Sequence, residues 1–249
     1  MTVLDMPFLD EARSRASTTT VRVADDAGAP VPLIVFGHGF SGHPRKFTKL
    51  LGAWAEAGHA VAAPAFPFTN DEFLGEPNRE DVVNQPADIR FVIDELLRSY
   101  ELRGLLDPER IGVSGFSLGA MTALAVGFNT EHRDPRLRAI AALSGRFWDD
   151  LGGTYEMDGR PLLVVHGTDD ALVPFETGEA VYRAADEPKV LVALEGARHH
   201  EEIEDGEGPI PAVVETTLAF WDLFLRGDGS ARERLLADRP RVRVSAAGL

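Results

Sequence analysis

The chain contains no cysteine among its 249 residues, which excludes disulfide bonds, thiolate nucleophiles and cysteine-ligated metals. It also lacks any apolar run close to the roughly 18 residues that a membrane-spanning helix needs. Basic residues are scarce, since 25 lysines and arginines stand against 40 acidic residues, for a formal net charge of −15. Nucleic acids and anionic membranes bind basic patches, so this balance argues against both as partners.

The remaining composition is that of an ordinary soluble globular protein, with 44% hydrophobic and 26% charged residues. The length suits a single domain, residues 1–249, with a core over about 18–226 and a loosely held, polar, arginine-rich tail over 227–249. Residues 1–15 carry acidic side chains and no apolar centre, unlike a secretory signal. We therefore expect a cytoplasmic protein; its oligomeric state is left open.

Short apolar segments alternate with amphipathic ones along most of the chain. Strands are predicted at 18–23, 33–36, 60–63, 110–114, 137–143, 161–165 and 190–194, and helices at 44–57, 88–102, 118–128, 175–185 and 213–225. Residues 64–86 hold four prolines and are expected to form a long surface loop. This alternation predicts an α/β fold, with a mostly parallel sheet covered by helices on both faces. In such sheets, functional residues gather in loops at the carboxyl ends of the strands.

The pentapeptide Gly115-Phe116-Ser117-Leu118-Gly119 lies at one such strand end, before an almost wholly apolar helix. G-x-S-x-G at a strand-to-helix junction is the pattern of a nucleophile elbow. A tight, strained turn lets the oxygen of Ser117 project from the sheet, and glycines flank it because strand and helix approach too closely for side chains. The helix also directs its first amides and its dipole toward negative charge beside Ser117. Ser117 is therefore the predicted nucleophile.

The predicted strand 33–36 ends in His38-Gly39-Phe40. A glycine-containing loop at this place can offer the backbone N–H of Phe40, and the residue after the nucleophile offers the N–H of Leu118. Together these two donors would form an oxyanion hole. The simpler alternative is a glycine turn that ends the strand. The adjacent elbow favours the oxyanion hole.

The segment from His166 to Pro174 follows the predicted strand 161–165 and offers two carboxylates. A carboxylate at this strand end can orient a histidine and stabilise its imidazolium form. Asp170 fits the pattern H-G-x-x-D-x-x-V-P and is preferred. Asp169 would then be a turn or capping residue.

The predicted strand 190–194 is followed by Gly196 and by two neighbouring histidines, His199 and His200. A histidine in this loop can take the proton of the serine. His199 lies three residues beyond Gly196 and is preferred over His200, and either position alone could be an exposed histidine without a function. The candidates occur in the order serine, aspartate, histidine, which differs from the order in other serine hydrolase folds.

From about residue 18 to residue 225, with these motifs in order at strand ends, the chain resembles the α/β-hydrolase superfamily. Within it, the chain is similar to bacterial dienelactone-hydrolase-like and platelet-activating-factor-acetylhydrolase-like esterases, although dienelactone hydrolases themselves use a cysteine nucleophile. The segment 8–13 weakly matches the opening of these esterases. The chain is also similar to cutinase-like polyester hydrolases, in which aromatic residues at the positions of Phe40 and Trp148 flank the substrate. Such aromatic residues can equally be core or pocket wall.

The residues and the resemblance together predict hydrolysis of a small carboxylic ester through an acyl-enzyme, with a triad of Ser117, His199 and Asp170 and no cofactor or metal. Too few residues separate the strands at 137–143 and 161–165 for a cap domain. We therefore expect an open site with five pocket walls: Phe40, Leu118, Phe147, Trp148 and Leu172.

Several alternatives remain open at this point. The same triad can serve a polyester hydrolase, a peptidase, an acyltransferase or a perhydrolase, because fold and triad do not choose the acyl acceptor. A non-catalytic binding protein on this scaffold is a further alternative. The acidic run Glu201, Glu202, Glu204, Asp205 and Glu207 predicts a solvated loop, with a calcium site as the alternative.

Overall fold

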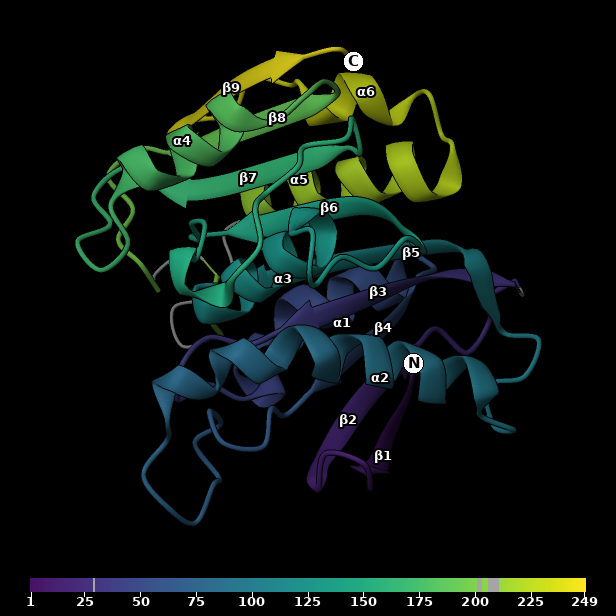
Figure 1. Ribbon diagram of the computed structural model, residues 1–249. Helices are drawn as coiled ribbons and strands as arrows, with labels where there is room; N and C mark the ends of the chain where they lie inside the picture. The colour runs from purple at the N-terminus through teal and green to yellow at the C-terminus, as the bar shows by residue number, and fades with distance from the viewer. Residues whose placement is uncertain (29, 201–202, 206–210) are drawn as a thin grey trace.

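The computed structural model, drawn in Figure 1, describes residues 1–28, 30–200, 203–205 and 211–249. Within these residues the chain forms one nine-stranded sheet in the order β1-β2-β4-β3-β5-β6-β7-β8-β9. The strands are β1 (Thr2–Asp10), β2 (Arg15–Val23), β3 (Val31–Gly37), β4 (Ala60–Pro64), β5 (Leu106–Phe116), β6 (Leu137–Leu143), β7 (Leu162–Gly167), β8 (Lys189–Leu194) and β9 (Val242–Ala247). All pairings from β4 to β8 are parallel, whereas β1, β2 and β9 join antiparallel at the edges. The predicted mostly parallel sheet is confirmed.

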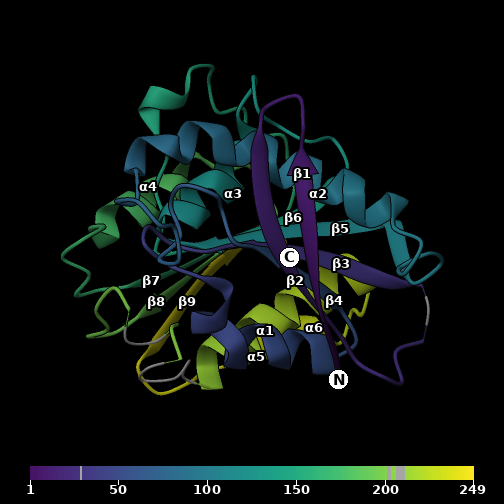
Figure 2. The same ribbon diagram turned by 90° about the horizontal axis from the view of Figure 1, so that it is seen from below.

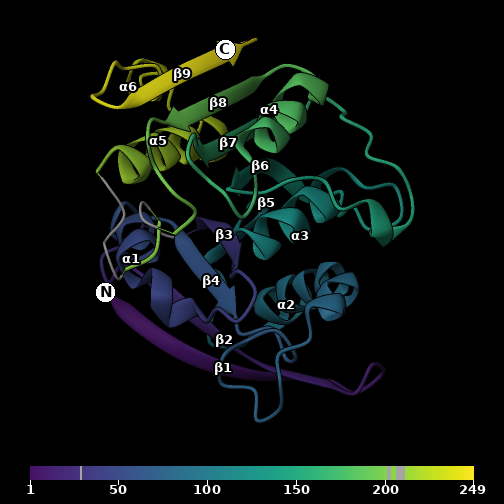
Figure 3. The same ribbon diagram turned by 90° about the vertical axis from the view of Figure 1, so that its left-hand side faces the viewer.

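Helices cover both faces of this sheet, as Figures 2 and 3 show. One face carries α2 (Gln85–Arg98), α3 (Leu118–Phe128) and α4 (Phe175–Ala184), and the other carries α1 (Thr48–Glu56), α5 (Pro211–Trp221) and α6 (Ala231–Leu235). Short turns of helix precede or follow these elements: η1 (Pro44–Phe47), η2 (Arg79–Asn84), η3 (Asp149–Leu151) and η4 (Asp222–Arg226). Side chains of β3 alternate between the two cores, with Leu33 and Val35 on the α2 face and Ile34 and Phe36 on the α1 face. The continuous apolar run of this strand thus buries both of its faces.

Both ends of the chain contain more structure than the sequence pattern predicts. The strand β1 pairs along its whole length with β2, although its sequence gave no strand prediction. The expectation of a loosely held tail is wrong, because β9 pairs antiparallel with β8 and its Val242 and Val244 pack against the core. Edge strands expose one side to water, so their polar composition resembles that of a tail.

The expectation of a plain surface loop over 64–86 is also wrong. This segment contains η2 and buries Phe66, Thr69 and Val82, and an ion-pair network fixes it to the hairpin of β1 and β2. The guanidinium of Arg15 donates two hydrogen bonds of 2.7–2.8 Å to Asp81 and two of 2.6–2.8 Å to Asp88. Because buried charges replace apolar side chains here, hydrophobic patterning did not reveal the contact.

The structure also bears on two other points, the presence of a cap domain and of a membrane-spanning helix. The segment between β6 and β7 contains η3 as its one described helical turn, in accordance with the expected absence of a large cap. In the part of the chain that the structure describes, no helix combines the length and apolar character that crossing a membrane requires.

Candidate active site

Ser117 occupies the turn between β5 and α3 with φ 54° and ψ −115°, a backbone conformation that side-chain-bearing residues rarely adopt. Its N–H donates to the carbonyl oxygen of Leu143 at 2.9 Å, which ties the turn to the end of β6. A Cβ on Gly115 would lie 2.2 Å from the carbonyl oxygen of Gly119. The flanking glycines are thus required by the close approach of strand and helix, and the strained turn has the geometry of a nucleophile elbow.

His199 lies between Ser117 and Asp170, in the loop that follows β8. Its Nε2 is 2.8 Å from Oγ of Ser117, and its Nδ1 is 2.6 Å from Oδ2 of Asp170. The imidazole is nearly buried and packs against the ring of Phe116, with 4.9 Å between ring centroids. Three residues from the ends of β5, β7 and β8 therefore form one continuous hydrogen-bonded chain that can move a proton from the serine hydroxyl.

Asp170 is fixed by its own loop. Its Oδ1 accepts the backbone N–H groups of Leu172 at 2.9 Å and Val173 at 2.8 Å. Burial alone raises the pKa of this carboxyl group, but the hydrogen bonds of His166, His199 and the Val173 N–H outweigh it and hold the pKa far below its ordinary value. Asp170 is therefore a fixed anion beside His199.

The two alternative residues have other partners. Asp169 accepts the hydroxyl of Thr168 at 3.3 Å, and its N–H donates to the carbonyl oxygen of Ala197. The side chain of His200 is 55% exposed, and its Nδ1 lies 3.2 Å from a carboxylate oxygen of Glu204. The geometry thus brings together Ser117, Asp170 and His199 as a set.

The loop after β3 lies directly beside the serine, since a Cβ on Gly39 would be 3.3 Å from Cβ of Ser117. His38 is fully buried beneath this loop: its Nε2 accepts the N–H of Phe66 at 3.0 Å, so Nδ1 carries the proton and donates to the Gly39 carbonyl oxygen at 2.7 Å. Burial lowers the pKa of His38 to about 4, which keeps the ring neutral. The burial of His38 and its two hydrogen bonds were not predicted from the sequence.

The two amides proposed as oxyanion donors are available for a ligand. In the described ranges of the chain, neither the N–H of Phe40 nor that of Leu118 donates a hydrogen bond to another protein group. Leu118 is the first residue of α3, where helix geometry leaves N–H groups without an intrahelical acceptor. Both donors lie next to Ser117, one in sequence and one through Gly39.

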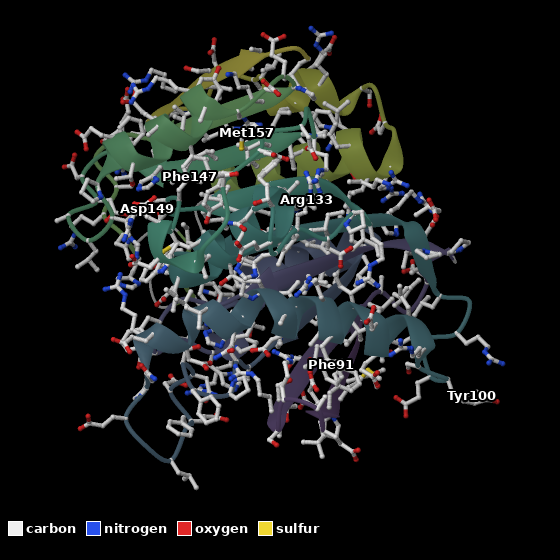
Figure 4. The ribbon with its side chains drawn as sticks, in the orientation of Figure 1. Phe91, Tyr100, Arg133, Phe147, Asp149 and Met157 are labelled. Atoms are coloured by element: carbon white, nitrogen blue, oxygen red, sulfur yellow. The ribbon has the colours of Figure 1, made fainter. Side chains whose placement is uncertain are left out.

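A cavity of about 320 Å³ opens at Ser117. The predicted wall residues Phe40, Leu118 and Leu172 line it, whereas Phe147 and Trp148 do not. The ring of Phe147 stacks on Tyr155 instead, with 4.4 Å between centroids, in the segment after β6 that Figure 4 marks with Phe147 and Met157. Trp148 packs against a hydrophobic cluster that includes the lining residues Leu118 and Met121. Spacing located the loop that carries these aromatic residues but could not predict the direction of their side chains.

Four residues that line this cavity were not predicted to do so: Arg79, Met121, Val173 and Glu204. Met121 stands four residues after Ser117, one helical turn along α3, and this spacing was a usable signal. Arg79 begins η2, whose position depends on the unexpected ion-pair network described above. No local sequence pattern identifies Arg79 as a residue that lines the cavity.

The acidic run lies partly outside the described residues, since Glu201, Glu202 and Glu207 are not described. Asp205 accepts the N–H of Lys49 at 3.0 Å, and its own N–H donates to the Lys46 carbonyl oxygen at 2.7 Å. Across the described parts of the chain, no group of three or more histidine, aspartate or glutamate side chains is arranged to hold a metal ion.

Comparison with known proteins agrees with this geometry. The family model described as phospholipase/carboxylesterase matches residues 75–202, slightly more than half of the chain and the part that contains Ser117, Asp170 and His199. The chain belongs to the phospholipase/carboxylesterase family. This membership makes it a carboxylic ester hydrolase of the α/β-hydrolase superfamily.

Individual relatives are also ester hydrolases. The chain is 27% identical over 195 residues to esterase YjfP of Escherichia coli strain K12, covering 64% of this chain and 76% of the relative. It is 31% identical over 111 residues to acyl-protein thioesterase 1 homolog 2 of Dictyostelium discoideum, covering 43% of this chain and about half of the relative. The structure of a ferulic acid esterase from Streptomyces cinnamoneus is similar with a TM-score of 0.71 and 21% identity, over 97% of this chain and 94% of that one. At this identity the structural likeness supports the fold alone.

Proposed function

We propose that this family member hydrolyses small carboxylic esters through an acyl-enzyme on Ser117, with His199 as general base and acid and Asp170 as its orienting carboxylate. The observation that carries the proposal is the hydrogen-bonded chain from Ser117 Oγ through His199 to Asp170, at 2.8 and 2.6 Å. In the first step His199 Nε2 takes the hydroxyl proton while Oγ attacks the ester carbonyl carbon. The low pKa of Asp170 keeps it anionic beside the imidazolium that forms.

The tetrahedral intermediate places its negative oxygen toward the N–H groups of Phe40 and Leu118, each worth roughly 3 kcal/mol of transition-state stabilisation. Its collapse breaks the bond to the alkoxide, which leaves with the proton from His199. Water then attacks the acyl-enzyme with His199 again as base, and release of the acid restores Ser117. The chain, the ester and one water molecule supply every atom that these steps use.

The test compares hydrolysis of p-nitrophenyl acetate and butyrate by the wild type and by Ser117→Ala, with folding checked by circular dichroism. Removal of a triad member typically lowers kcat by several orders of magnitude. Ser144→Ala is the matched control, because Ser144 has the same unusual positive φ at a neighbouring strand end but lies outside the hydrogen-bonded chain. Loss of activity in Ser117→Ala alone is the expected result, and equal activity in both variants would refute the assignment.

A further inference from the structure

The cavity at Ser117 has two sides of different chemical character. On one side, His199 and His200 pack against Phe116, whose ring belongs to the core on the α1 face, and Glu204 pairs with His200. The other side is formed by three apolar residues, Leu118, Met121 and Val173, with the guanidinium of Arg79 at its margin over Trp148. Together with Val82 these three form a separate hydrophobic cluster, outside both main cores of the sheet.

The chemistry of ester hydrolysis assigns a substrate part to each side, and this step rests on the proposed function. The leaving alkoxide must receive its proton from His199, so the alcohol lies on the histidine side. The carbonyl oxygen is directed to the N–H groups of Phe40 and Leu118. The acyl chain is the remaining substituent at the tetrahedral carbon, and it therefore points toward the apolar side.

Met121 closes that apolar side. Met121 as a whole is 1% exposed yet lines the cavity, and its N–H donates to the carbonyl oxygen of Ser117 at 3.1 Å. It stands one helical turn beyond the nucleophile on the same helix, so its position relative to Ser117 is fixed by backbone geometry.

An aromatic side chain outside the cavity lining packs against the cluster that contains Met121. Trp148 packs against the cluster of Val82, Leu118, Met121 and Val173. Two guanidinium groups lie over the indole of Trp148, that of Arg79 at 5.4 Å and that of Arg146 at 5.2 Å from the ring centroid. Such cation–π contacts hold an indole in place, so the methionine has little freedom to withdraw before a longer substrate.

We propose that Met121 is the end wall of the acyl site and restricts the enzyme to esters of short acyl chains. The thioether is flexible, but Met121 is buried within the cluster against which Trp148 packs, so little free space surrounds it. A longer chain would have to leave the apolar pocket and expose its methylenes to water. Each methylene that can instead be buried is worth roughly four-fold in kcat/KM.

The experiment measures kcat/KM for linear p-nitrophenyl esters from acetate to decanoate with the wild type, Met121→Ala and Met121→Phe. We expect a short-chain optimum in the wild type. Met121→Ala should raise the ratio of octanoate to acetate about ten-fold or more, and Met121→Phe should lower the ratio of butyrate to acetate. Met157→Ala is the matched control, since Met157 packs against the main core and not the cavity.

The opposite shifts of the two Met121 variants separate specificity from stability, because simple destabilisation lowers kcat/KM for all esters alike. If Met121→Ala does not fold, the butyrate-to-acetate ratio of Met121→Phe tests the role of Met121 instead. An unchanged chain-length profile in both variants, or the same shift in Met157→Ala, would overturn the role of Met121 while hydrolysis itself persists. No hydrolysis of any ester by the wild type would overturn the proposed function and this inference together.

Discussion

Gly119 lies so close to the end of β3 that a Cβ at this position would stand 2.0 Å from the carbonyl oxygen of Gly37. The contact brings the first turn of α3, with Leu118, against the loop of His38 and Phe40. Gly37 and Gly119, which are 82 residues apart in the sequence, thus lie in contact beside the nucleophile. The close approach of α3 to the end of β3 therefore requires glycine at position 119.

The first prediction is that Gly119→Ala abolishes ester hydrolysis and destabilises the fold. The added methyl group meets backbone atoms that cannot rotate away, so the helix must shift, and overpacking of this kind costs about 1–3 kcal/mol or more. Urea unfolding and p-nitrophenyl acetate hydrolysis measure the two effects. Gly229→Ala is the control, because a Cβ there meets no atom within 4 Å. A Gly119→Ala variant with wild-type activity would contradict the close approach.

The second prediction distinguishes the two neighbouring carboxylates. Asp170→Asn loses the anion beside His199 and disturbs its tautomer, and we expect kcat to fall by about 10³–10⁴. Asp169→Asn should change kcat by less than about five-fold, because its side chain contacts Thr168 instead. Steady-state kinetics on one ester at pH 7.5 give the comparison. A larger loss in Asp169→Asn would mean that the wrong aspartate was assigned.

The third prediction concerns stability at acidic pH. Burial lowers the pKa of His38 and of His59 to about 4. The unfolded chain therefore binds these two protons near pH 6.5 while the folded chain still excludes them, so stability is complete above pH 6.5 and falls between pH 6.5 and about 4. At pH 5 the loss is about 2 kcal/mol for each histidine.

Urea unfolding at pH 7 and pH 5 measures this loss. His59→Gln leaves the proposed site untouched and should reduce the loss by about 2 kcal/mol. A free energy of unfolding that changes equally in wild type and variant would show that His59 does not exclude its proton.

The fourth prediction concerns the buried ion pairs that connect Arg15 of β2 to the segment that begins with Arg79. Arg15→Ala leaves Asp81 and Asp88 buried without their shared guanidinium, and breaking a buried pair of this kind costs about 3–5 kcal/mol. Arg98→Ala removes an exposed pair with Glu95 and should cost less than about 0.5 kcal/mol. Thermal unfolding of both variants gives the comparison. Similar costs for the two would contradict a structural role for the buried network.

Much of the site could be predicted because its chemistry demands particular residues at particular strand ends. Gly115, Ser117 and Gly119 form a pattern that only a tight strand-to-helix turn requires. The choice of Asp170 over Asp169, and of His199 over His200, agrees with the observed hydrogen bonds. The helices and inner strands were also predictable, since their side chains follow the apolar periodicity of a sheet buried on both faces.

The remainder depended on contacts that no local pattern contains. The position of strand β9 is set by its pairing with β8. The position of segment 64–86 is set by ion pairs with Arg15. Similarly, the position of the Trp148 indole depends on packing against the cluster that contains Met121 and on two guanidinium groups. Sequence spacing indicated that Trp148 lies near the site, and its tertiary contacts decided which residues it touches.

The most direct test of the account is covalent trapping of the nucleophile with a p-nitrophenyl phosphonate ester, followed by digestion and mass spectrometry. We predict one phosphonyl group per chain, on the peptide that contains Ser117, with a proportional loss of ester hydrolysis. His199→Ala should react far more slowly, because the hydroxyl then lacks its base at 2.8 Å. Inactivation with the adduct on another residue, or equally fast labelling of His199→Ala, would contradict the proposed roles of these two residues.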